Sequence, residues 1–184
     1  MPDKFKSCCF TGYRPQKFPF RFDSADKAFR VMENKLIDAV FSLPAEGCYT
    51  FYSGMAMGFD IVAAEAVLLL REGCKTASIK LICALPYIEQ AAAFTGDWKK
   101  RYEDILSKAD EVVLISDQYY KSCYQKRNMF MVDNSDFVIT WFDGKPGGTK
   151  NTLAYAARKG ARIINLQDAG VHEYFYENDY ELIK

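Results

Sequence analysis

Histidine is almost absent from this sequence, in which His172 is the only one among 184 residues. A histidine-based metal site usually combines several such ligands, and a Ser–His–Asp triad needs one imidazole held between two partners. A lone histidine near the end of the chain is more typical of an exposed surface position. The zinc-hydrolase motif H-E-x-x-H, which needs two histidines, is excluded outright.

Two phosphate-binding signatures and all long apolar segments are missing as well. The chain contains neither the G-x-x-x-x-G-K-[ST] loop nor the G-x-G-x-x-G fingerprint, since Gly54 and Gly58 are spaced G-x-x-x-G. Kinases and ordinary dehydrogenases are therefore disfavoured. No apolar run approaches the ~18 residues that would span a membrane, and no secretory signal precedes the first strand-like run. We expect no membrane partner.

The cysteines and the charges further restrict the class of protein to which this chain can belong. The six cysteines form no C-x-x-C pair, and Cys8, Cys9 and Cys83 fall in strand-like runs, where a free thiol packs as a small hydrophobe. We therefore expect a reduced, cytoplasmic protein. The net charge is zero, from 24 basic and 24 acidic residues. A neutral chain does not bind duplex nucleic acid by bulk electrostatics, although a local basic patch can hide in the total.

What the sequence does contain is a regular alternation of strand-like and helix-like segments. Apolar, β-branched or aromatic runs predict strands at residues 7–11, 49–53, 80–85, 111–116, 137–142 and 162–166. Helical periodicity predicts helices from a cap at Asp23 or Ser24 to Val40, and at residues 61–71, 98–106, 125–132 and 153–159.

This alternation is typical of an open parallel sheet with helices on both faces, the three-layer Rossmann-like arrangement of α/β proteins. The continuous apolar runs at 112–115 and 137–139 predict strands buried on both faces. With 49% hydrophobic residues and this length, we expect one domain over residues 1–184. The pattern gives no clear structure for residues 167–184.

The stretch from Phe137 to Ala161 has the local plan of a phosphate cradle. A buried strand is followed by a glycine-rich turn at 143–148 and then by helix formers that end at Gly160. Glycines let the backbone approach an anion, and the free N–H groups of the helix start then point at it. Nearby side chains add hydroxyls and positive charge: Thr149, Thr152, Lys145 and Lys150. The alternative is an ordinary tight turn that closes a β–α unit.

Glycines collect at one end of the predicted sheet. Of the 11 glycines, six follow the first, second and fifth strands: Gly12, Gly54, Gly58, Gly144, Gly147 and Gly148. Ligands of open α/β sheets bind beyond the carboxyl ends of the strands. The asymmetry therefore favours a phosphate or nucleotide site over a plain connector.

Several motifs resemble those of the SLOG superfamily, a Rossmann-like nucleotide-binding group that includes the Smf/DprA proteins and the Lonely Guy phosphoribohydrolases. S-G-M-A-M-G-F-D at 53–60 resembles the Smf/DprA motif S-G-x-A-x-G-x-D. R-N-M-F-M-V-D-N-S-D at 127–136, followed by P-G-G-T-K-N-T at 146–152, resembles the second half of that fold and Lonely Guy. T-G-Y-R-P at 11–15 and A-L-P-Y-I-E-Q-A-A-A-F at 84–94 are similar to the YpsA-like branch of small bacterial proteins.

The resemblance implies a nucleotide or nucleotide-derived ligand of ADP-ribose or NAD-like character, bound by a sensor or regulator. It implies no other cofactor and no metal. Together with the cradle, it places these residues at the ligand: Thr11, Gly12, Arg14, Ser53, Gly54, Gly58, Asp60, Arg127, Gly147, Gly148, Thr149 and Thr152.

Catalysis stays open because the chain departs from the Lonely Guy pattern P-G-G-x-G-T-x-x-E. Arg127 matches the arginine that works with that glutamate on the N-glycosidic bond, but Thr152 or Ala154 stands at the glutamate position. Neither exchanges a proton as a carboxylate does. Candidate replacement acids are Glu89, Asp117 and Asp143. A hydrolase of nucleotide N-glycosidic bonds is therefore the alternative function.

A third possible function is the binding of single-stranded nucleic acid, by analogy with DprA. Such binding needs basic residues interleaved with aromatics, a pattern present at Lys121, Tyr124, Lys126 and Arg127. The neutral net charge weighs against it. The sequence leaves the oligomeric state open, a homo-oligomer included.

Single residues have competing interpretations. Arg127 either clamps a phosphate or lies on a solvated helix face beside Lys126, and Arg14 has the same two interpretations. Asp60 either binds a ribose hydroxyl or caps the helix that starts beside it, which is the more common role. The tyrosines that follow strands either stack on a base or simply pack: Tyr13, Tyr87 and Tyr119.

Overall fold

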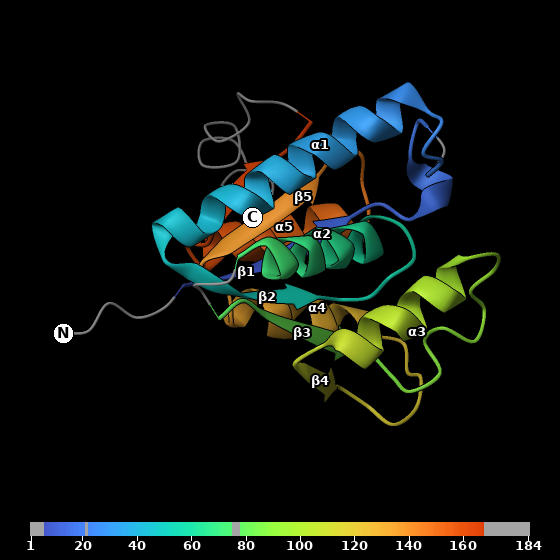
Figure 1. The fold of residues 1–184 in the computed structure, drawn as a ribbon. Coiled ribbons are helices and arrows are strands. Elements are labelled where there is room, and N and C mark those ends of the chain that lie inside the picture. The colour runs from blue at the N-terminus through green and yellow to red at the C-terminus, as the bar shows by residue number, and fades with distance from the viewer. Residues whose placement is uncertain (1–5, 21, 75–77, 168–184) are drawn as a thin grey trace.

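The computed structural model describes residues 6–20, 22–74 and 78–167, which form a six-stranded sheet with helices on both faces (Figure 1). All strand pairs are parallel, in the order β4-β3-β2-β1-β5-β6. The strands are β1 (Lys6–Gly12), β2 (Cys48–Ser53), β3 (Lys80–Leu85), β4 (Glu111–Leu114), β5 (Phe137–Trp141) and β6 (Arg162–Asn165). The predicted three-layer parallel α/β fold is confirmed.

Five α-helices cover the sheet, and two short 3-10 helices, η1 (Pro15–Lys17) and η2 (Leu43–Glu46), follow β1 and α1. In Figure 1, α1 and α2 lie in front of the sheet and α4 and α5 lie behind it, while α3 packs beside α2. The helices are α1 (Lys27–Ser42), α2 (Phe59–Gly73), α3 (Trp98–Lys108), α4 (Cys123–Asp133) and α5 (Gly148–Arg158).

The strand order puts a topological switch point between β1 and β5. From β1 the chain builds outward through β2 and β3 to β4, then returns to place β5 on the other side of β1. The loops after β1 and β5 therefore diverge toward opposite helical layers. Open α/β sheets bind ligands in the crevice that such loops leave, so this edge is where the fold itself predicts a site.

The prediction that residues 112–115 are buried on both faces is wrong, whereas the matching prediction for β5 is confirmed. Every residue of β5 is buried, but Val112 and Leu114 of β4 are 47% and 40% exposed. The reason is strand order. β5 lies inside the sheet between β1 and β6, while β4 is an edge strand with a neighbour on one side only.

The start of α1 also differs from the prediction. Its N-cap is Asp26, whose carboxylate accepts hydrogen bonds from the N–H groups of Ala28 at 2.8 Å and Phe29 at 3.4 Å. Asp23 instead accepts from the N–H of Ala25 at 2.9 Å in the preceding turn. Three candidate caps lie within four positions here, and the apolar periodicity alone does not choose between them.

All six cysteines are free thiols, and all except the half-buried Cys74 are buried. Within the ranges described, no helix is both long and apolar enough to cross a membrane. The same residues contain no group of three or more His, Cys, Asp and Glu side chains that could hold a metal ion. His172 lies outside the described residues, as does the tail from residue 168.

We predict that Asp26→Ala lowers the free energy of unfolding by about 0.5–2 kcal/mol, because two N–H groups of the first turn of α1 lose their acceptor. Urea denaturation measures the change. Ser24→Ala is the matched control and should leave stability within about 0.5 kcal/mol of the parent. Equal losses in the two variants would mean that Asp26 is not the cap.

Candidate functional site

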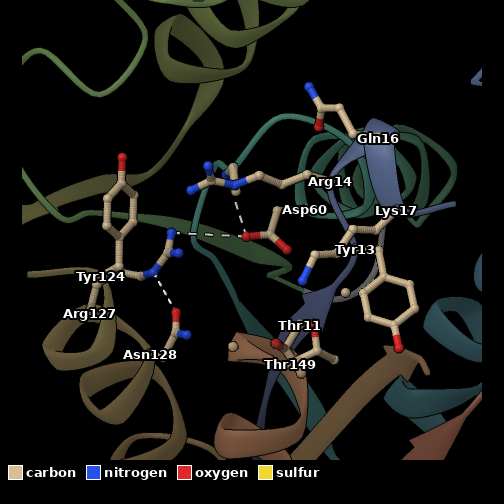
Figure 2. Close-up of a pocket in the computed structure, with 13 residues that line it drawn as sticks. Thr11, Tyr13, Arg14, Gln16, Lys17, Asp60, Tyr124, Arg127, Asn128 and Thr149 are labelled. Carbon is tan, nitrogen blue, oxygen red and sulfur yellow. Dashed lines mark hydrogen bonds and ion pairs between the residues drawn. The ribbon is translucent and has the colours of Figure 1, made fainter. Parts of the chain in front are cut away.

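A cavity of about 360 Å³ opens at the switch point, beyond the carboxyl ends of β1 and β5 (Figure 2). Its walls come from the loop after β1, the turn into α2, α4 and the start of α5. The lining residues are Thr11, Gly12, Tyr13, Arg14, Gln16, Lys17, Ala56, Asp60, Tyr124, Arg127, Asn128, Gly148 and Thr149.

The start of α5 forms one wall and leaves its backbone N–H groups without a side-chain cap. Its N-cap is Gly147, with φ 149° and ψ −168°, a conformation that favours glycine. Gly148 is already helical, and a Cβ added there would meet nothing within 4 Å. Lys17 reaches this helix end, since its Nζ lies 3.0 Å from where a Cβ on Gly147 would be. Uncapped N–H groups, a helix dipole and an ammonium thus meet at one point.

Arg127 is a buried residue of the wall, only 4% exposed, so the solvated-face interpretation is wrong. Its guanidinium donates to the carbonyl of Gly54, and its Nε donates to Oδ1 of Asn128 at 2.7 Å. The close approach explains the glycine, because a Cβ at Gly54 would collide with the guanidinium. Burial lowers the pKa of Arg127.

Asp60 faces Arg127 across the cavity floor, with Oδ2 3.9 Å from the arginine Nη1 (Figure 2). Burial raises the pKa of this carboxyl from 3.8 to about 6, against the opposing effects of Arg127, the Ala56 N–H and Arg14. The loose ion pair does not offset the loss of water.

The interpretation of Asp60 as a helix cap is wrong. The N-cap of α2 is Gly58, and Asp60 lies in the first turn of the helix. Its carboxylate accepts from the backbone N–H of Ala56 at 3.4 Å, in the turn before the helix. It therefore orders that turn and presents a carboxyl to the cavity.

The structure gathers seven of the predicted site residues in the cavity wall: Thr11, Gly12, Arg14, Asp60, Arg127, Gly148 and Thr149. Figure 2 shows the side chains of Arg14, Lys17 and Arg127 reaching into the space around Asp60. The guanidinium of Arg14 also lies 5.2 Å from the ring centroid of Tyr124, in a cation–π contact.

The other predicted residues lie behind the wall and shape it. Ser53 Oγ donates to the carbonyl of Asp60 at 2.9 Å and accepts from the Met55 N–H at 3.1 Å. Thr152 Oγ1 accepts from Nδ2 of Asn128 at 2.9 Å. Gly58 has φ 104°, and a Cβ there would lie 2.8 Å from the carbonyl oxygen of Tyr13. Gly54 leaves room for the guanidinium of Arg127, and Gly147 is the N-cap of α5.

Two candidates from the fifth-strand turn, Lys145 and Asp143, do not line the cavity. Lys145 pairs with Asp143 at 2.6 Å, and Asp143 also accepts from the hydroxyl of Tyr13. The ring of Tyr13 packs against Phe18 and Phe142, and the same residue lines the cavity. The remaining lysine and replacement acids do not line the cavity: Lys150, Glu89 and Asp117.

Sequence reasoning missed Gln16, Lys17 and Asn128, and it named Tyr124 only for nucleic acid. The 3-10 turn η1 brings Gln16 and Lys17 to the cavity, and Pro15 at its first position was the available signal. Asn128 follows Arg127 directly and is held by Thr152, a partner that only the packing of α4 against α5 supplies.

The comparisons with known proteins identify the family and agree with the fold. The YpsA family model, described as the YspA SLOG family, matches residues 8–168, so the chain belongs to this family. It is 31% identical over 140 residues to the uncharacterized SPbeta prophage-derived protein YoqJ of Bacillus subtilis (strain 168), covering 69% of this chain and 81% of that protein. A UPF0398 protein of Bacillus thuringiensis (strain Al Hakam) is 26% identical over 172 residues, covering 92% and 89%.

Two solved structures share the fold. DNA processing protein A of Helicobacter pylori, known for a single-stranded DNA binding mode, aligns with a TM-score of 0.57 at 19% identity. DprA of Streptococcus pneumoniae aligns with a TM-score of 0.61 at 18% identity. The alignments cover 88% and 95% of this chain but only 65% and 57% of those proteins. At such identities the likeness concerns the fold alone.

We predict an inverted pH dependence for the contribution of Asp60 to stability. With a pKa raised to about 6 in the folded state, its contribution is full below about pH 4 and is lost as pH rises through 6. The free energy of unfolding of the parent minus that of Asp60→Asn should therefore fall over this window, by at most about 1.4 kcal/mol per pH unit.

Urea titrations at several pH values between 4 and 7.5 measure this difference. The exposed Asp104→Asn, which removes a carboxylate paired with Lys108 on the surface of α3, is the matched control. A difference that rises with pH for Asp60→Asn would show that the ion pair with Arg127 outweighs burial.

Proposed function

We propose that this chain binds a nucleotide or nucleotide derivative, of ADP-ribose or NAD-like character, in the cavity at the switch point and acts as a sensor or regulator. One observation carries the proposal: the uncapped start of α5, Lys17, Arg14 and the buried Arg127 converge on one cavity of about 360 Å³. A phosphate or diphosphate is the ligand that such a set of donors suits.

The charge balance of the wall supports an anionic ligand. Three cationic side chains line the cavity, Arg14, Lys17 and Arg127, against the single carboxylate of Asp60. Burial also raises the pKa of Asp60 to about 6, so this carboxyl is only partly ionised near that pH. The local excess is positive although the whole chain is neutral, and a phosphate would complete the balance.

The absence of a carboxylate where Lonely Guy proteins carry their glutamate favours binding without turnover. Thr152 Oγ1 is engaged with Asn128 and with the Gly148 carbonyl at 2.8 Å, so it serves the wall. Ala154, the alternative position, has no side chain able to exchange a proton. A sensor needs a formed pocket but no proton relay, and this is what the geometry supports.

A second candidate, hydrolysis of an N-glycosidic bond, is favoured by Asp60 alone. It is a carboxyl in the cavity wall with a pKa near 6, in the range that suits a general acid or base at neutral pH. Chromatography of nucleotides incubated with the protein tests it. Release of free base by the parent, lost in Asp60→Asn while binding persists, would assign turnover to this residue.

Single-stranded nucleic acid is the remaining candidate. A neighbouring cavity of about 530 Å³ between α4 and α5 combines basic and aromatic side chains, Lys121, Tyr124, Tyr155 and Arg158 among them. Structural neighbours include the single-stranded DNA-binding DprA of H. pylori. Binding of an oligonucleotide that is lost on Arg158→Ala and unaffected by Lys17→Ala would favour this cavity over the switch-point site.

We predict that ADP-ribose or a nucleotide raises the melting temperature of the parent and that Lys17→Ala weakens its affinity about ten- to a hundredfold, because a charge-assisted contact to phosphate is lost. Isothermal titration measures the affinity. Lys145→Ala is the matched control, since this exposed lysine pairs with Asp143 outside the cavity.

No stabilisation by any member of a broad panel at millimolar concentration would overturn the nucleotide proposal. If ligands bind but Lys17→Ala and Lys145→Ala behave alike, the phosphate does not lie at the start of α5.

A further inference from the structure

A smaller cavity of about 120 Å³ adjoins the switch-point cavity. The two share part of their walls, namely Arg14, Ala56 and Tyr124. The additional lining residues of the smaller one are Met57, Tyr87, Gln90, Ala93 and Phe94. A single ligand can therefore contact both, with its phosphate in the larger cavity and another group in the smaller one.

The wall of the smaller cavity contains a buried hydrogen-bond acceptor without a partner. Gln90 is 5% exposed, and its Nε2 donates to the carbonyls of Gly54 at 3.2 Å and Met55 at 2.5 Å. Carbonyls only accept, so these two bonds fix which end of the amide is nitrogen. Its Oε1 is buried and, within the described chain, accepts no hydrogen bond.

An unpaired buried acceptor destabilises the empty protein, and a ligand with an N–H donor would relieve that cost. The other buried side-chain atoms without a partner in the described residues belong to residues that line neither cavity: Ser135 Oγ, Thr140 Oγ1 and Trp141 Nε1. The unpaired acceptor thus belongs to a residue that lines the candidate site.

The rest of the smaller cavity suits a planar ring. Tyr87, Tyr124 and Phe94 supply aromatic surface, and Met57 adds an adaptable apolar side chain. The hydroxyls of Tyr87 and Tyr124 lie 3.3 Å apart, and the two rings meet edge to face, which holds both tyrosines in place. Aromatic walls of this kind bind nucleobases through their π-faces.

We propose that the smaller cavity is a base subsite for adenine, whose exocyclic amino group donates an N–H to Oε1 of Gln90 once the side chain shifts to expose this buried atom to the cavity. The proposal rests on the proposed nucleotide function and adds that the site recognises the base of the nucleotide. Hypoxanthine has the same ring shape but a carbonyl oxygen in place of the amino group. It would set one acceptor against another at Gln90 and should be rejected.

The test compares AMP with IMP and ADP with IDP by titration calorimetry, with ribose 5-phosphate as a probe that has no base. We expect the parent to bind each adenine nucleotide at least tenfold more tightly than its hypoxanthine counterpart. In Gln90→Met, which removes the acceptor at similar volume, that preference should fall below threefold. The affinity for ribose 5-phosphate should change little, and Gln118→Met on the exposed surface is the matched control.

The outcomes separate this inference from the proposed function. If ribose 5-phosphate and the nucleotides bind but the parent does not prefer adenine, the base subsite is wrong and the phosphate site stands. If the preference for adenine survives in Gln90→Met, another group recognises the base and the role proposed for Gln90 is wrong. If nothing binds, both proposals fall. The comparison on the parent decides the matter even if Gln90→Met does not fold.

Discussion

A buried guanidinium at the carboxyl edge of the sheet holds the candidate site together. Arg127 extends from α4, in one helical layer, to the carbonyl of Gly54 after β2 and toward Asp60 on α2, in the other layer. A charge without water is stable only where partners surround it. The glycine at position 54 and the turn around Ala56 are arranged to supply those partners, so the cavity floor depends on this one side chain.

The same arrangement leaves polar groups of the cavity floor without a full set of hydrogen-bond and ion-pair partners. Arg127 Nη1 and Asp60 Oδ2 are 3.9 Å apart rather than in close contact. Burial lowers the pKa of Arg127 and raises the pKa of Asp60, so it favours the neutral form of each. Gln90 holds the same turn from the other side and keeps one acceptor unpaired. Buried polar groups with incomplete partners lower the stability of the protein, and such groups are common where a ligand completes the network.

The sequence predicted the fold well because periodicity and turn residues are local signals. The six strands and five α-helices of the described residues lie where the patterns placed them, with ends that differ by up to five residues, most at the start of α5. Burial of β4 was mispredicted because it depends on strand order, which alternation does not determine. Within the site, glycine loops identified Arg14 and Asp60, and the family resemblance identified Arg127. The roles of Lys17 and Gln90 depend on contacts between segments distant in the chain.

The switch-point topology also determines when the site can form. Two of its walls come from the loop after β1 and the start of α5, and the contact between Tyr13 and Asp143 joins positions 130 residues apart. Such long-range closure comes late in folding, because chain entropy must be lost before the contact forms. A nascent chain through β4 therefore lacks the cavity wall that α4 and α5 supply, and the cavity is complete only after β5 has paired with β1.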